Sequence, residues 1–239
     1  MRSVPNDKGI GDTDLEGTSV IFDLDGTLID TATDLAASMN HAIAADGLAA
    51  LDVSAVRHLV GHGARRMLSE AYQLAGCEAD GDMLDRSLDR FLDYYYGNIA
   101  DHSRPFPRVE EEIGVLRRAG ARVAICTNKR EAPAVKLIET LGLSFLFDVI
   151  VGADSTAAAK PDPAPVRRCL DVTGARRAVF VGDSDTDIRA ADNIGLPCVA
   201  VRFGYGPLTL KDQAVLVIDT YAGFAARVDE LAHAPARVV

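Results

Sequence analysis

Short runs of Val and Ile, separated by helix-length segments, constrain the fold of this 239-residue chain more than any other feature. Continuous apolar runs of this length are typical of strands that are buried on both faces. The segments between the later runs end at Gly142, Gly174 and Gly195, and glycine suits the residue that follows a helix. The predicted strands are residues 19–24, 122–127, 147–151, 178–183 and 197–201.

Strands and helices that alternate in this way indicate an α/β fold with a doubly wound, mostly parallel sheet. We expect the last helix over 220–233, with Thr220 as its N-cap. The alternation is interrupted once, over the 95 residues from 26 to 120, which is far more than one crossover helix needs. Four segments of this stretch have helical patterns: 31–46, 53–60, 64–76 and 82–100.

The interruption divides the chain into parts. Residues 1–17 are rich in Gly, Asp and Asn, and we expect them to form a flexible leader. The other expected parts are an α/β core over 18–32 and 104–239, an inserted helical domain over 33–103, and hinges near Asp30–Thr33 and Ser103–Pro107.

Composition and charge exclude several classes of protein. The 35 acidic residues outnumber the 25 basic ones and give a formal net charge of −10, which argues against a protein that holds nucleic acid through clustered Lys and Arg. No apolar stretch approaches the roughly 20 residues that cross a bilayer, and the leader has no apolar signal-peptide region. The four cysteines lie far apart and are expected to be buried thiols. We therefore expect a cytoplasmic protein, monomeric or homodimeric, with no nucleic-acid or membrane partner.

Two acidic residues follow the first predicted strand. In an extended segment, side chains at positions i and i+2 point the same way, so Asp23 and Asp25 are expected to face one site. This is also where open α/β sheets bind ligands, beyond the carboxyl ends of the strands. The structural alternative is an Asp-Gly turn with solvated acids. That alternative explains Gly26 but not a pair of acids directly after a strand.

The second and third predicted strands also lead to polar residues. Thr127 and Asn128 offer a hydroxyl and backbone N–H groups that suit a phosphate oxygen, although such a pair is also a common helix cap or turn. Lys160 precedes Pro161, which restrains the backbone, and its ammonium is a candidate fixed point charge. Taken alone, Lys160 is equally well explained as a surface residue before a helix that starts with proline.

The fourth predicted strand leads to three further acids. Asp183, Asp185 and Asp187 offer the oxygen ligands that Mg²⁺ prefers. Caps of the next helix are a strong alternative for Asp185 and Asp187, and a weaker one for Asp183. Since each of these groups follows a successive strand, all of them are expected to converge at one edge of the sheet.

In chain order, the motifs Asp-x-Asp-Gly-Thr, Thr-Asn, Lys-Pro and Gly-Asp-x-x-x-Asp closely resemble those of the haloacid dehalogenase-like phosphohydrolases. The resemblance spans about residues 19–220. It implies an α/β core whose helical insert is a cap domain of the C1 type. It also implies a phosphatase that acts on a small phosphorylated metabolite.

The resemblance further implies roles for the acids. Asp23 would be the nucleophile that attacks phosphorus and becomes an aspartyl-phosphate. Asp25 would protonate the leaving alkoxide and then serve as the base for the hydrolytic water. The Asp23 carboxylate, the Asp25 backbone carbonyl and Asp183 would hold the Mg²⁺ cofactor.

The remaining motif residues would act on the phosphate group. By the same resemblance, Thr127, Asn128 and Lys160 would bind phosphate oxygens, and Lys160 would also take part in catalysis. Asp187 would orient the ligands of the metal or Lys160.

Within the family, the segments 60–63 and 182–187 are most similar to those of phosphoglycolate phosphatases. The stretch from Gly61 reads as a glycine-bearing turn that enters a helix, and such a helix start attracts anions. Arg65 is therefore a candidate to bind a substrate carboxylate, while a solvated helix face explains it equally well. For His62 and Arg66 the structural explanation is the better one.

One segment departs from the family pattern. Residues 107–109 read Pro-Arg-Val, where relatives usually have Pro-Gly-Val. Arg108 either stiffens a hinge or alters closure of the insert over the core.

Other functions are compatible with parts of this pattern. A phosphosugar mutase of the β-phosphoglucomutase type, or a phosphatase for other small esters or pyrophosphate, would use the same chemistry. A signalling receiver domain also places an acid, a hydroxyl and a Lys around Mg²⁺, but Asp25 and the 95-residue insertion argue against it. A binding protein without activity is disfavoured because every position that the chemistry needs is filled.

Overall fold

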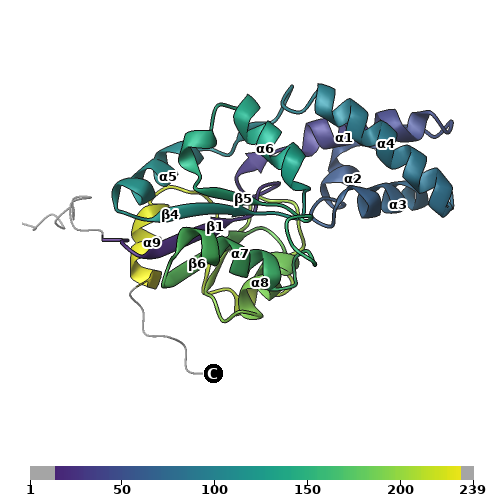
Figure 1. Ribbon diagram of the computed structural model, residues 1–239. Coiled ribbons are helices and arrows are strands. Elements are labelled where there is room, and N and C mark those ends of the chain that lie inside the picture. The colour runs from purple at the N-terminus through teal and green to yellow at the C-terminus, as the bar shows by residue number, and fades with distance from the viewer. Residues whose placement is uncertain (1–13, 233–239) are drawn as a thin grey trace, which may run out of the picture.

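The computed structural model describes residues 14–232 as an α/β sheet with helices on both faces and a group of further helices at one end (Figure 1). Six strands form the sheet in the order β5-β4-β1-β6-β7-β8, and every neighbouring pair is parallel. The doubly wound sheet is therefore confirmed. The strands are β1 (Thr18–Phe22), β4 (Arg122–Cys126), β5 (Val149–Val151), β6 (Arg177–Gly182), β7 (Cys198–Val201) and β8 (Leu216–Ile218).

Two cores lie on opposite faces of this sheet. Successive side chains of a strand point to opposite faces, so Val20 and Phe22 join one core while Ile21 joins the other. The first face is covered by α5 (Val109–Arg118), α6 (Glu131–Thr140) and α9 (Phe224–Ala232). The second face is covered by α7 (Ala164–Thr173) and α8 (Asp185–Asp192).

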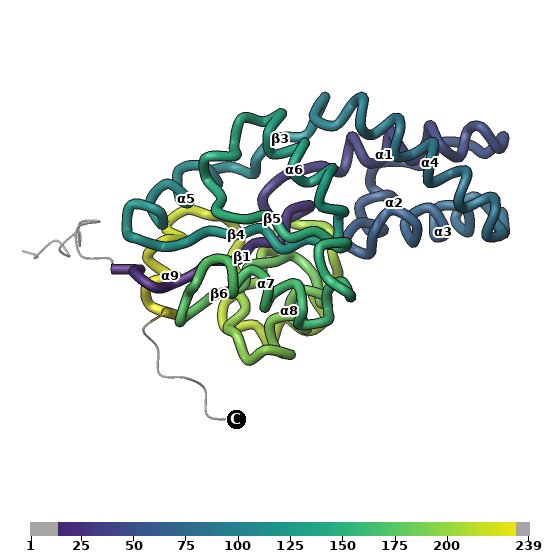
Figure 2. Tube along the Cα trace, in the orientation of Figure 1, coloured from purple at the N-terminus to yellow at the C-terminus, as the bar shows by residue number. Residues whose placement is uncertain are grey.

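The insertion lies beyond the carboxyl ends of the strands, where its helices pack against one another (Figures 1 and 2). Its helices are α1 (Ala32–Ala44), α2 (Val53–Arg57), α3 (Ala64–Leu74) and α4 (Gly81–Gly97), close to the four predicted segments. The chain enters and leaves the insertion through two short antiparallel strands, β2 (Ile29–Asp30) and β3 (Arg104–Pro105). The predicted domain boundaries fall at this connection, and we propose it as the hinge.

Buried polar contacts tie the two connecting segments together. Asp34 in α1 accepts hydrogen bonds from the backbone N–H of His102 (3.0 Å) and from the N–H and hydroxyl of Ser103 (2.7 and 2.6 Å). Burial raises the pKa of Asp34, but these bonds outweigh burial, and its pKa lies below the ordinary value. Asp34 is therefore a charged anchor at the base of the insertion.

The ends of the chain differ in part from what the sequence predicts. The last helix begins at Phe224, so Thr220 is not its N-cap; the Thr220 hydroxyl instead accepts from Ala222 N–H in a local turn. The core begins before residue 18, because Leu15 is fully buried and donates its N–H to the Ala119 carbonyl. Most of the predicted leader, residues 1–13, lies outside the described residues, as does residue 233 at the end of the predicted last helix.

Within the described part of the chain, no helix is long and apolar enough to cross a membrane. All four cysteines are free thiols, as predicted; Cys126, Cys169 and Cys198 are buried, whereas Cys77 is only half-buried.

Arg108 occupies a position that favours glycine. It precedes α5 with φ at +70°, in the left-handed region. Its guanidinium donates to Glu111 at 2.9 Å and to the buried Glu112 at 3.4 Å. Arg108 is not among the residues that line the large cavity described below. An arginine at position 108, where relatives usually have glycine, is therefore expected to strain the backbone and not to contact a ligand in the cavity.

The strain can be separated from the ion pairs with two variants. Arg108→Ala removes the ion pairs and keeps a side chain in the left-handed region, whereas Arg108→Gly also relieves the backbone. We expect Arg108→Gly to be more stable than Arg108→Ala by about 1 kcal/mol, measured by urea unfolding. Equal stability of the two variants would contradict this account of the position.

Candidate active site

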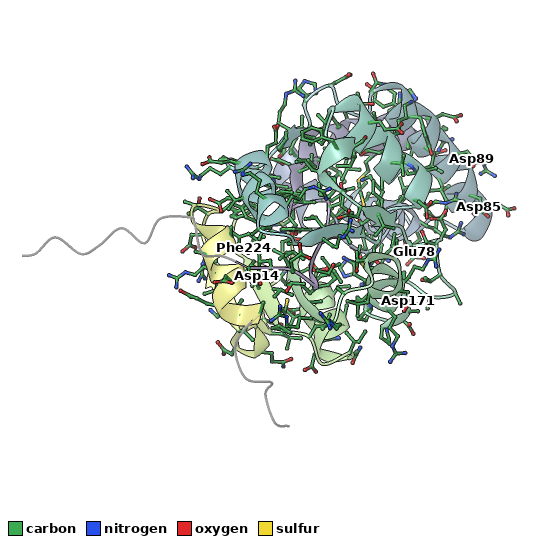
Figure 3. The ribbon with its side chains drawn as sticks, turned by 60° about the vertical axis from the view of Figure 1, so that its left-hand side comes forward. Asp14, Glu78, Asp85, Asp89, Asp171 and Phe224 are labelled. Atoms are coloured by element: carbon green, nitrogen blue, oxygen red, sulfur yellow. The ribbon has the colours of Figure 1, made fainter. Side chains whose placement is uncertain are left out.

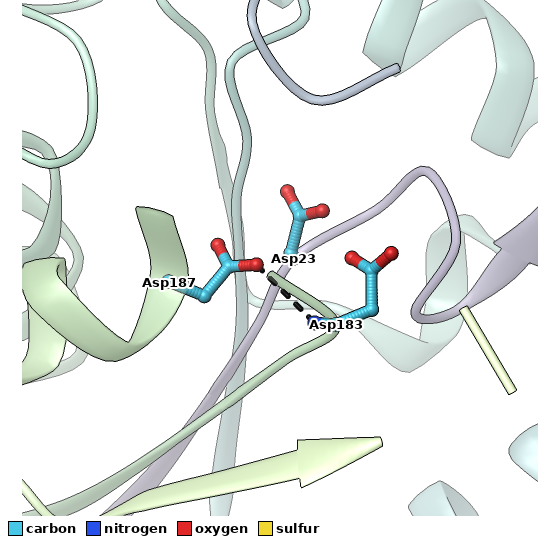
Figure 4. Close-up of side chains that lie close together, drawn as sticks. All are labelled: Asp23, Asp183 and Asp187. Atoms are coloured by element: carbon cyan, nitrogen blue, oxygen red, sulfur yellow. Dashed lines mark hydrogen bonds between the residues drawn. The ribbon is translucent and has the colours of Figure 1, made fainter. Parts of the chain in front are cut away.

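The predicted residues meet where the strand order reverses. Asp23 directly follows β1, and Asp183 directly follows its neighbour β6. From β1 the chain builds the sheet outward through β4 and β5, then crosses back to β6, so this edge is a topological switch point. The side chains of Asp23, Asp183 and Asp187 lie close together there (Figure 4).

A buried lysine joins two of these acids. Lys160 Nζ donates to Asp23 Oδ1 at 2.8 Å and to Asp187 Oδ1 at 2.7 Å, and Lys160 is only 5% exposed. Burial lowers the pKa of Lys160, but the charges of Asp187 and Asp23 outweigh burial and hold it above the ordinary value. Lys160 is therefore a fixed cation inside the site and not a surface residue.

Asp187 is both a helix cap and part of the charged cluster. Its Oδ2 accepts from the Ser184 hydroxyl at 2.7 Å and from the Ser184 and Asp183 N–H groups, while Oδ1 accepts from Lys160. Ser184 and Asp187 form a capping box at the start of α8. Asp185 points elsewhere, toward Thr209 and the Leu210 N–H, and acts as a structural residue.

Backbone donors hold Asp183, and sequence reasoning did not identify them. Asp183 Oδ2 accepts from the N–H groups of Tyr205 (2.7 Å) and Gly206 (3.1 Å), and Oδ1 accepts from the Thr27 hydroxyl (3.2 Å). A Cβ at Gly204 would overlap the Asp183 side chain, so the loop after β7 needs glycine to come this close. The only sequence signal was the Gly-Tyr-Gly triplet shortly after that strand.

The charges of the cluster favour a divalent cation. Oxygen atoms of Asp23, Asp183 and Asp187 lie within 4.8 Å of one another, and one ammonium, from Lys160, faces these three carboxylates. Burial raises the pKa of Asp23 to about 7; Asp187 and Asp183 add to the rise, and Lys160 opposes it. Burial and the Asp187 charge likewise raise the pKa of Asp183 to about 6. When all three carboxylates are ionised, the single ammonium leaves two negative charges uncompensated, and hard oxygen ligands suit a divalent cation such as Mg²⁺.

Asp25 lies in a second ion pair. Lys129 Nζ donates to both of its carboxylate oxygens at 2.7 Å, and the Thr31 hydroxyl donates to Oδ1 at 2.7 Å. Burial lowers the pKa of Lys129, but the Asp25 charge outweighs burial and raises it above the ordinary value. Sequence reasoning gave no role to Lys129, although it directly follows the Thr-Asn pair.

Thr127 and Asn128 lie beside this pair. Thr127 is buried at the end of β4, and its hydroxyl accepts from Lys129 N–H. The side-chain amide of Asn128 donates to the carbonyl oxygens of Gly61 and Lys160, at 3.0 and 3.1 Å. Asn128 therefore bridges the insertion and the core through its side chain.

A cavity of about 600 Å³ opens over these residues, between the core and the insertion. Arg65 lines it, but its guanidinium pairs with Asp85 of α4 and both groups are exposed. Asp85 lies at the outer edge of the molecule (Figure 3). Arg66 pairs with Glu70, and His62 Nδ1 is buried with no partner among the described residues.

The fold and this site define a hydrolase class. A model of the haloacid dehalogenase-like hydrolases matches residues 20–201, and the chain belongs to that family, as its motifs indicated. A phosphoglycolate phosphatase of Mesorhizobium japonicum is 48% identical over 78% of this chain and 83% of its own length. One of Agrobacterium fabrum is 42% identical over 84% and 88%. The crystal structure of a predicted phosphoglycolate phosphatase from Haemophilus somnus has a TM-score of 0.81 at 29% identity, covering 90% of this chain and 98% of its own.

The close approach of Gly204 to Asp183 predicts the effect of a single methyl group. Gly204→Ala should displace the Asp183 carboxylate. If the acidic cluster binds a divalent cation, its affinity should fall about 10-fold or more, measured by titration calorimetry with Mg²⁺ as the probe. The matched control is Gly97→Ala in α4, where nothing lies within 4 Å of the added atom. If Gly204→Ala binds Mg²⁺ as tightly as the Gly97→Ala control does, the role given to Gly204 is wrong.

Proposed function

We propose that this chain is an Mg²⁺-dependent phosphomonoester hydrolase that forms an aspartyl-phosphate on Asp23 and acts on 2-phosphoglycolate. The observation that carries the proposal is the contact of buried Lys160 with Asp23 and Asp187 beside Asp183, at the switch point of the sheet. The names of the relatives support the choice of substrate.

In this proposal Asp23 attacks phosphorus, and Lys160 makes the attack possible. A carboxylate that approaches a phosphate dianion meets repulsion of about 4 kcal/mol per pair of unit charges at 4 Å, for an effective dielectric constant near 20. Lys160 is fixed on Asp23 Oδ1 and offsets part of that repulsion without reorganising. Covalent capture divides the hydrolysis into two easier steps.

The residues that would hold Mg²⁺ are Asp23, Asp183 and the backbone carbonyl of Asp25. When bound, Mg²⁺ supplies a Lewis acid that neutralises charge on the phosphate oxygens. Asp187 would not bind Mg²⁺ directly, because its oxygens already accept hydrogen bonds from Lys160 and from the Ser184 hydroxyl. It orients Lys160 and the turn that carries Asp183.

The other residues would complete the two half-reactions. Asp25 would enter the first step protonated and give that proton to the leaving alkoxide. As a carboxylate it would then accept a proton from the attacking water, which restores its starting state; such proton transfer contributes about 10²- to 10⁴-fold. The Thr31 hydroxyl and Lys129 fix the orientation of its carboxyl group. The Thr127 hydroxyl and the backbone N–H of Asn128 would bind phosphate oxygens. The Asn128 side chain instead joins Gly61 to Lys160.

A second candidate is a phosphatase for a larger ester. The cavity of about 600 Å³ exceeds what a two-carbon substrate fills, and one wall is apolar, from Leu84, Leu88, Phe91 and Leu92 of α4. A phosphosugar mutase would use the same core. A receiver domain is disfavoured, because it needs neither the Asp25 ion pair nor a cavity under an insertion.

A panel of phosphate-release assays tests the proposed function. The purified protein, with Mg²⁺ or with EDTA, is given 2-phosphoglycolate, hexose phosphates, pyrophosphate and nucleotides. We expect release from 2-phosphoglycolate at the highest kcat/KM, and loss of release in EDTA. A preference for hexose phosphates would favour the larger substrate, and equal rates in EDTA would reject the metal.

Asp23→Asn tests the nucleophile. The amide keeps the shape of the side chain but is a very poor nucleophile, so kcat should fall at least about 1,000-fold. Circular dichroism would check that the variant stays folded. A folded variant with a near-normal rate would rule out attack by Asp23.

A further inference from the structure

The cavity is richer in cations than the chain as a whole. Four cationic side chains line it, against two acidic ones, although the chain carries a net charge of −10: Lys129, Arg65, Arg66 and Arg130 against Asp23 and Asp25. A cleft whose charge opposes that of the whole protein favours an anionic ligand. Three of these cations are exposed arginines already paired with nearby acids. Lys129 is the cation that is buried.

Of these four cations, Lys129 also lies closest to the proposed chemistry. Its ammonium contacts both oxygens of Asp25 at 2.7 Å, and on its other side it lies 4.9 Å from the ring centre of Tyr95 in α4. An ammonium group has three N–H donors, and two of them point at Asp25. The remaining donor faces the Tyr95 side chain, where a second oxygen anion can replace the tyrosine as its acceptor.

Tyr95 supplies a second, independent signal. It is 1% exposed and lines the same cavity, and its hydroxyl faces the Lys129 ammonium but has no partner at normal hydrogen-bond geometry within residues 14–232. Burying a hydroxyl without a partner is costly, so such groups in a cavity usually meet a ligand. A carboxylate beside Lys129 and Tyr95 would satisfy both groups at once.

We propose that Lys129, assisted by the Tyr95 hydroxyl, binds the carboxylate of the substrate and so selects 2-phosphoglycolate over uncharged phosphate esters. The inference rests on the proposed function. In 2-phosphoglycolate only one CH₂ group separates the leaving oxygen from the carboxylate. A cation that contacts Asp25, the proposed proton donor to that oxygen, is therefore within reach of the carboxylate.

This assignment differs from the candidate that the sequence offered. Arg65 was the candidate for the carboxylate, but its guanidinium pairs with Asp85 and also donates to the Gly81 carbonyl. Lys129 is contributed by the core and Tyr95 by the insertion, so a carboxylate bound by both would also hold the two parts together.

The test compares one substrate that has a carboxylate at that end with one that has none. Ethyl phosphate has a methyl group where 2-phosphoglycolate has its carboxylate. For Lys129→Met, the ratio of kcat/KM for 2-phosphoglycolate to that for ethyl phosphate should fall about 10- to 100-fold. Loss of the Asp25 ion pair lowers the rate with both substrates, so the ratio reports mainly on the carboxylate. A ratio that stays within about threefold of wild type would overturn the assignment.

Further variants separate the alternatives. Lys136→Met is the matched control, because Lys136 also lies over a tyrosine of α4, Tyr96, but does not line this cavity. Its ratio should stay at the wild-type value. Lys129→Arg should restore part of the selectivity. If Arg65→Met lowers the ratio and Lys129→Met does not, Arg65 is the carboxylate ligand and our assignment is wrong.

Tyr95→Phe keeps the test decisive if Lys129→Met does not fold. It removes only the hydroxyl, and the same ratio should fall about 3- to 10-fold; an unchanged ratio in that folded variant would count against the pair. The wild-type protein separates this inference from the proposed function. A wild type that does not prefer 2-phosphoglycolate would refute the substrate, whereas a preference that survives in Lys129→Met would refute only the role of Lys129.

Discussion

The ion contacts of Lys160 are the interaction on which the rest of the site depends. Its ammonium is buried between carboxylates that follow two different strands, β1 and β6. Removing one partner of a buried ion pair costs about 3–5 kcal/mol, because it leaves an uncompensated charge. The charges of Asp23, Asp187 and Lys160 therefore stabilise one another at the edge of the sheet. The same contacts position the proposed nucleophile.

The sheet topology makes this convergence possible. Parallel strands end at one edge, and the reversal of strand order between β1 and β6 leaves room beyond them. Glycines then let backbone and side chains come closer than any Cβ would permit: Gly182 against Asp187, and Gly204 against Asp183. Two contacts join the insertion to this edge. The Asn128 amide donates a hydrogen bond to the Gly61 carbonyl, and the Lys129 ammonium lies over the Tyr95 ring.

The sequence predicted which side chains gather at this edge of the sheet, because strand ends are visible as boundaries of apolar runs. Asp23, Thr127, Lys160 and Asp183 all lie at the predicted edge. It did not predict the N–H groups of residues 205 and 206 that hold Asp183, since backbone donors leave no mark in the residue type.

Other features escaped prediction from the sequence because they depend on tertiary contacts or on local backbone conformation. Strand β8 has three half-buried residues, too few for a periodic signal, and Thr220 bonds within a turn instead of capping a helix. The role of Lys129 depends on how the insertion packs on the core, because Tyr95 comes from a helix that is distant in sequence. For Arg108, the departure from the family pattern was visible, but its meaning came from the left-handed backbone at that position.

The central claim is that phosphate is transferred to Asp23, and chemical trapping tests it most directly. p-Nitrophenyl phosphate has a leaving group that departs without a proton, so Asp25→Asn should still form the acyl-phosphate but hydrolyse it slowly. Acid quenching and borohydride reduction would convert a phosphorylated aspartate to homoserine, which peptide mass spectrometry locates. Our account predicts homoserine at position 23. Homoserine at another position, or none while phosphate is still released, would contradict it.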